Sequence, residues 1–125
     1  MASPQKMTVQ AEAPDQLVMN GIGGDARGIQ GVVKFQARVR VTANGGKMTA
    51  HADRIAVSGA HSAILLIVAA TNYVNWKDVS ADQEARAKEY LSKIGDTPYE
   101  KLLAGHVAEH QRLFRRVELD VGNSD

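Results

Sequence analysis

Apolar and polar residues alternate through the first two thirds of the chain, and this alternation predicts β-structure. It is clearest in VVKFQARVRVT, where a single long strand would place its apolar and polar side chains on opposite faces. The apolar face is formed by Val33, Phe35, Ala37, Val39 and Val41, and the polar face by Lys34, Gln36, Arg38, Arg40 and Thr42. We expect the polar face to be in contact with water.

Two further features extend the β prediction. The sequence NGG at Asn44–Gly46 predicts a hairpin turn, because Asn and Gly accept the positive φ angles that such turns need. The segment SAILLIVAAT, residues 62–71, is apolar on both faces. A strand with one face in water would alternate, so we expect a second sheet or helices on each side of this segment, at the centre of the core.

The hydrophobic period changes to that of a helix at Ser80. A capping-box pattern, Ser80 with Gln83, precedes an apolar stripe that ends at Gly95. Thr97 and Pro98 then begin a second helix that is predicted to run to about Arg115. The alternating VELDV that follows predicts a terminal strand.

The predicted fold class is therefore α+β, mainly β, with an antiparallel β-sandwich followed by two helices and a short terminal strand. The predicted organisation is a β-sandwich portion at 1–79, a two-helix segment at 80–115, and a terminal strand and tail at 116–125.

Composition excludes several classes of function. A chain of 125 residues has the length of one ordinary domain. Its net charge of +1 is too small to attract the chain to nucleic acid or to a membrane surface. The absence of cysteine leaves only His and carboxylates as metal ligands. The longest apolar run, residues 63–70, is far shorter than the roughly 20 residues that span a bilayer. The opening MASPQKMTVQ contains no apolar segment of the signal-peptide kind.

Two motifs suggest ligand binding but fail in context. GIGGDA, residues 21–26, fits a dinucleotide-binding loop, yet such a loop needs a helix after it and here a long strand follows. The basic row of Lys34, Arg38 and Arg40 has no interleaved aromatic residues on which bases could stack. We therefore predict neither a cofactor nor a nucleic-acid partner.

HVAEH, residues 106–110, has the His-x-x-Glu-His pattern of inverted zinc metallohydrolases. On a helical wheel, however, His106 and His110 fall within the apolar stripe of the second helix, and only 15 residues follow His110 to supply a third ligand. We interpret both histidines, with Phe114, as interface-packing residues and expect no metal. The alternative, a small zinc hydrolase, requires stoichiometric metal and loss of activity in His106→Ala.

TNYVNW, residues 71–76, combines two aromatic side chains with two amides, a composition that could stack on a sugar ring. The simpler interpretation is that Tyr73 and Trp76 seal the seam between sheet and helices. No Ser/His/Asp, Cys/His or paired-carboxylate set stands out, so no catalytic residue is predicted.

The order of the segments GIQGVVKFQARVRV, ATNYVNWKDVS and HVAEHQRLFRRVELDVG resembles the N-terminal region of glycoside hydrolase family 95, the bacterial and plant α-L-fucosidases. The resemblance covers nearly the whole chain. It implies the latter part of a β-supersandwich domain and the linker helices that follow it. In that family the inverting catalytic site lies in an (α/α)6 barrel, so the resemblance carries over no catalytic residue, and whether this chain is itself an enzyme is left open.

The resemblance implies a non-catalytic fragment that scaffolds a barrel hydrolysing terminal α-L-fucosyl bonds, with His106 and His110 in an interdomain helix. Its expected partners are the rest of the supersandwich, the barrel and, through the full enzyme, fucosylated glycans in the periplasm or outside the cell. The isolated piece is expected to self-associate or to pair with its missing half. The alternative is a free-standing carbohydrate-binding β-domain that uses Tyr73 and Trp76.

Overall fold

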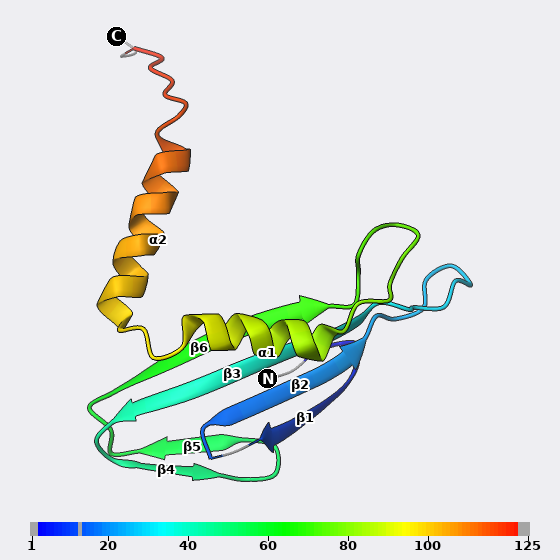
Figure 1. The fold of residues 1–125 in the computed structure, drawn as a ribbon, viewed down its shortest axis with the longest axis horizontal. Coiled ribbons are helices and arrows are strands. Elements are labelled where there is room, and N and C mark those ends of the chain that lie inside the picture. Colours follow the sequence, from blue (N-terminus) through cyan, green and yellow to red (C-terminus); the bar gives the residue numbers. More distant parts are fainter. Residues whose placement is uncertain (1–2, 13, 123–125) are drawn as a thin grey trace. The chain divides into compact units, whose positions relative to one another are not determined.

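A computed structural model describes residues 3–12 and 14–122. It divides into two compact units, Met1–Gly95 and Asp96–Asp125, which are treated separately. The elements, shown in Figure 1, are β1 (Lys6–Glu12), β2 (Gln16–Ile22), β3 (Lys34–Asn44), β4 (Lys47–Ala50), β5 (Ile55–Ser58), β6 (Ser62–Thr71), α1 (Gln83–Ile94) and α2 (Tyr99–Phe114). This mainly antiparallel β-structure with two helices confirms the predicted fold class.

A four-stranded sheet in the order β1-β2-β3-β6 forms the larger unit, and every pair in it is antiparallel. β3 is the long central strand, and β4 and β5 form a separate two-stranded sheet. NGG connects β3 to β4 with φ angles of 74° at Gly45 and 70° at Gly46, but it is not the predicted hairpin turn, because β4 pairs with β5 and not with β3. A Cβ at Gly46 would lie 2.3 Å from the carbonyl oxygen of Ser58, so the turn requires glycine for space as well as for φ.

Helix α1 lies across one face of this sheet, over β3 and β6 (Figure 1). Its N-cap is Asp82, whose carboxylate accepts hydrogen bonds from the amides of Glu84 and Ala85 at 2.8 and 3.0 Å. The predicted Ser80 capping box is therefore wrong by two positions. The buried Ala87 and Leu91 of α1 pack with Val68 and Ala70 of β6, and Leu66 and Ile94 flank this cluster.

The alternation predicted that the polar face of β3 contacts water, but this holds only toward the ends of the strand, where Lys34 and Thr42 are exposed. Gln36 and Arg38 are only 1% and 2% exposed, because α1 covers the face that carries them. Alternation separates the two faces of a strand, but it does not say which face another element will cover. Burial of the arginine is tolerated here because Glu12 and Glu84 supply opposite charges.

β6 is covered on one side, not on both as predicted. Val68 and Ala70 are buried beneath α1, whereas Leu65 and Ile67, which point to the other face, are 57% and 65% exposed. Within the larger unit, as far as the structure describes it, no sheet or helix covers these two side chains.

α2 forms the body of the smaller unit and has no buried residue. It begins after Pro98, where Thr97 had been predicted as the cap. The predicted terminal strand is not formed, since residues 117–122 have no strand partner in the described part of the chain and 123–125 lie outside it. An alternating pattern sets the faces of a strand but cannot supply the pairing that makes one. Neither described helix is long and apolar enough to cross a membrane.

Candidate functional site

The loop after β6 carries Tyr73 and Trp76, the two aromatic residues that are candidates for sugar contact. Trp76 is 80% exposed and Tyr73 is 48% exposed. The Lys77 ammonium lies 4.4 Å from the centroid of the Trp76 ring, a distance typical of a cation–π contact. Trp76 therefore does not seal the seam between sheet and helix within the larger unit, and a role in sugar contact stays a prediction.

A tight turn presents Trp76. Asn75 and Asp78 exchange two backbone hydrogen bonds, of 3.1 and 3.0 Å, across it. The side chains are also engaged, because Asn75 Oδ1 accepts from the Lys77 amide at 3.0 Å and Asp78 Oδ1 accepts from the Ser80 amide at 2.8 Å. The hydrogen bonds from Ser80 lower the pKa of Asp78. The polar groups of the turn thus hold its own backbone and fix the place of the tryptophan.

Asn72 anchors the base of this loop. It is 5% exposed, and its Oδ1 accepts from the Lys34 amide at 2.8 Å. Its Nδ2 donates to the carbonyl oxygens of Val32 at 3.3 Å and Val79 at 2.8 Å. One amide therefore joins the segment before β3, the first residue of β3 and the segment before α1. In the sequence, the Asn72 amide was one of two amides that suggested sugar binding. In the structure, its hydrogen bonds hold the loop in place.

Arg86 of α1 adds a second anchor. Its Nη1 donates to the carbonyl oxygens of Thr71 and Tyr73 at 3.0 and 2.8 Å. Both carbonyls belong to the turn out of β6, so the helix holds the start of the loop directly. Together with Asn72, this contact makes the aromatic loop a pre-organised surface rather than a flexible one.

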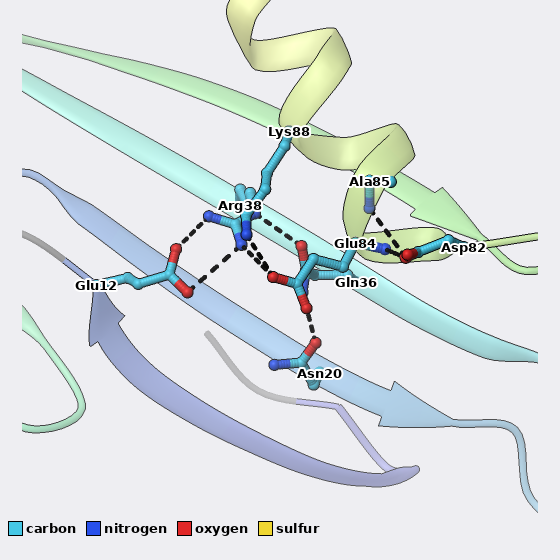
Figure 2. Close-up of polar contacts among 8 residues, drawn as sticks. All are labelled: Glu12, Asn20, Gln36, Arg38, Asp82, Glu84, Ala85 and Lys88. Atoms are coloured by element: carbon cyan, nitrogen blue, oxygen red, sulfur yellow. Dashed lines mark hydrogen bonds and ion pairs between the residues drawn. The ribbon is translucent and has the colours of Figure 1, made fainter.

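A buried polar network surrounds Arg38 beneath α1 (Figure 2). Arg38 Nη1 donates to Glu12 at 2.5 Å, its Nε donates to Gln36 Oε1 at 2.7 Å, and Nη2 lies 3.7 Å from Glu84 Oε1. Gln36 in turn donates to Asn20 Oδ1 at 2.7 Å. The network therefore connects β1, β2, β3 and α1 through one guanidinium group.

The electrostatics of this network favour a structural role. The hydrogen bond from Arg38 is the main cause that lowers the pKa of Glu12. Glu84 is shared with Lys88, whose ammonium lies 2.5 Å from it. Each charge in the network is matched by an opposite one, which is typical of an ion-pair network that holds elements together. The alternating pattern of β3 gives no sign of this network, because its acidic members, Glu12 and Glu84, lie far from Arg38 along the chain.

The predicted interdomain residues follow one another along α2. The ring centroids of His106 and His110 are 6.3 Å apart, and those of His110 and Phe114 are 5.4 Å apart in a stacked arrangement. All three side chains are exposed, and interdomain packing stays a prediction for them. The carboxylate of Glu109 is held by Arg112 at 2.6 and 2.8 Å, which lowers its pKa. Among the residues that the structure describes, no group of three or more His, Asp and Glu could hold a metal ion.

Comparison with known proteins gives one match. The family model described as glycosyl hydrolase family 65, N-terminal domain, matches residues 1–76. The match spans all six strands and ends at Trp76, which is more than half of the 125 residues. No curated protein matches the chain. The resemblance seen in the sequence is confirmed as that of a glycoside hydrolase N-terminal domain, although the matching model is that of family 65 and not family 95.

Proposed function

This chain belongs to the family of glycosyl hydrolase family 65 N-terminal domains, and from that premise we propose that it scaffolds the catalytic barrel of an α-L-fucosidase-like enzyme. The single observation that carries the proposal is the family match over the whole β-structure. The fucosyl specificity rests on the resemblance of ATNYVNWKDVS and HVAEHQRLFRRVELDVG to family 95, which also suggests a periplasmic or extracellular enzyme. The chemistry itself is assigned to the barrel.

The face of the sheet opposite α1 supports a role as one layer of a larger domain. Met19, Val39 and Val41 on this face are buried, whereas Leu65 and Ile67 at its β6 edge are exposed. The face opposite α1 carries apolar side chains, one glycine and one threonine from β2, β3 and β6, namely Leu17, Met19, Gly21, Phe35, Ala37, Val39, Val41, Ala43, Ala63, Leu65, Ile67, Ala69 and Thr71. In a β-sandwich such a face packs against a second sheet about 10 Å away. The proposed partners are therefore the rest of the supersandwich on this face and the barrel against His106, His110 and Phe114.

The test is release of the aryl group from an aryl α-L-fucoside. We expect no release by this chain, because the proposal places the acid and base groups in the barrel, and release by a longer polypeptide that includes the barrel. An aryl α-D-glucoside assayed beside it tests the fucosyl specificity. Release by the chain alone would contradict the scaffold role, and loss of that release with a chelator would support the zinc-hydrolase alternative.

A second candidate is a carbohydrate-binding domain, and the 80% exposure of Trp76 on a fixed turn favours it. If Trp76 stacks on sugar, Trp76→Ala is expected to weaken binding of methyl α-L-fucoside about tenfold, since such contacts contribute about 1.4 kcal/mol. Calorimetric titration measures this. Tyr99→Ala removes another exposed aromatic side chain, 51% exposed, from α2 and serves as the control. An equal loss in both variants, or no binding by the unmodified chain, would exclude Trp76 as a sugar platform.

A further inference from the structure

β6 presents an open backbone edge. The strand order places it at the end of the four-stranded sheet, and within the described residues β3 is its sole strand partner. The Asn72 amide, which continues the register of β6, donates to the Lys34 carbonyl at 3.1 Å. Bonding in an antiparallel pair alternates, so even-numbered residues of β6 bond to β3 and odd-numbered ones point their N–H and C=O groups outward.

This edge lacks the protection that natural sheet edges usually have. Edge strands are commonly short, interrupted by proline or bulged, or they carry charged side chains. β6 has ten residues, SAILLIVAAT, with no charge and no proline. By contrast β1, at the other edge of the sheet, begins at Lys6 and ends at Glu12. The two edges therefore differ in how readily they can accept another strand.

We propose that two copies of this chain pair through β6, edge to edge and antiparallel, so that two four-stranded sheets become one continuous sheet. The occupant is a second copy because an uncharged strand meets no like charge when it lies beside itself. In one alignment of the two antiparallel strands, β6 also pairs well with its own copy. With Leu66 on the two-fold axis, Leu65 of each copy lies opposite Ile67 of the other, and residues 62–70 are paired.

In this register, the outward backbone groups of the two strands can bond each other, and their exposed apolar side chains come into contact. Leu65 and Ile67 are both odd-numbered, so their outward N–H and C=O groups can bond each other across the axis. Their side chains lie on the same face and are the most exposed large apolar side chains of β6, at 57% and 65%. As a cross-strand pair on each side of the axis, they remove one another from water. The contact is isologous and closes at two copies.

Sedimentation of the purified chain over a concentration series tests the pairing. We expect the mass to approach twice 13.5 kDa as concentration rises. Ile67→Lys is expected to weaken the association at least about tenfold, because it desolvates an ammonium group in the new sheet. Thr8→Lys places the same charge on exposed β1 and is expected to leave the dimer unchanged. Circular dichroism checks that both variants keep the sheet, which is expected because Ile67 is largely exposed.

The absence of cysteine allows a direct test of the register. Differently tagged Leu65→Cys and Ile67→Cys chains are mixed and oxidised. Opposed residues have Cα atoms about 5.5 Å apart, within disulfide range, whereas a residue and its own copy are diagonal neighbours about 7–8 Å apart. Mixed cross-links are therefore expected to form faster than like cross-links. A monomer at every concentration, an association unaffected by Ile67→Lys, or like cross-links as fast as mixed ones would overturn the proposal. These readouts are independent of any glycosidase activity.

Discussion

Arg38→Met is expected to lower the free energy of unfolding by about 3 kcal/mol. Two effects contribute to the loss. Gln36, only 1% exposed, loses the donor to its Oε1 and keeps a buried acceptor without a partner. Glu12 and Glu84 lose their counter-charge, but at 42% and 48% side-chain exposure they can rehydrate, which makes this part the smaller. Urea denaturation followed by circular dichroism measures the difference.

Lys88→Met provides the matched control for this experiment. Lys88 contacts the same Glu84 carboxylate as Arg38, but its side chain is 55% exposed. An exposed helical ion pair contributes only about 0.5 kcal/mol, so a small effect is expected. If Arg38→Met were no more destabilising than Lys88→Met, the buried network would contribute nothing beyond the packing of its aliphatic parts. In that case, contact between α1 and the sheet would rest on the apolar cluster around Leu91 and on the hydrogen bond from Arg86 to Thr71.

Local chemistry accounts for the parts of the fold that the sequence predicted well. The NGG turn follows from the φ angles that Gly45 and Gly46 accept, and the β3 strand follows from its alternation. Neither depends on residues far along the chain. The positive φ angles at Gly45 and Gly46 and the β3 strand were therefore predicted correctly, whereas the hairpin was not, because β4 pairs with β5 and not with β3.

Predictions that depended on a distant partner were less successful. The side of β3 that is buried depends on α1, which begins only at Gln83, so the wet face assigned to Arg38 was wrong. VELDV alternates like a strand but finds no partner among the described residues. The sequence located Tyr73 and Trp76 in one loop, yet it could not identify Asn72 as the buried anchor beneath them, because its hydrogen bonds reach residues 32 and 34.

Asn72→Ala is expected to cost about 2 kcal/mol of stability and to loosen the aromatic loop. The substitution removes one acceptor and one donor group that together make three hydrogen bonds to backbone. The estimate is below the sum of three buried bonds because Val32 and Lys34 are exposed enough for water to replace part of what is lost. Thermal or urea unfolding gives the stability, and the fluorescence of Trp76, the single tryptophan, reports on the loop.

Asn72→Asp and Asn75→Ala separate the contributions of the anchor. Asn72→Asp keeps the acceptor for the Lys34 amide but places a carboxylate against the carbonyls of Val32 and Val79, so it is expected to destabilise at least as much as Ala. Asn75→Ala removes a single exposed bond and is expected to cost about 0.5 kcal/mol. Equal effects of Asn72→Ala and Asn75→Ala would contradict the anchoring role. A fluorescence change in Asn72→Ala without loss of the sheet would show that this buried amide sets the position of Trp76.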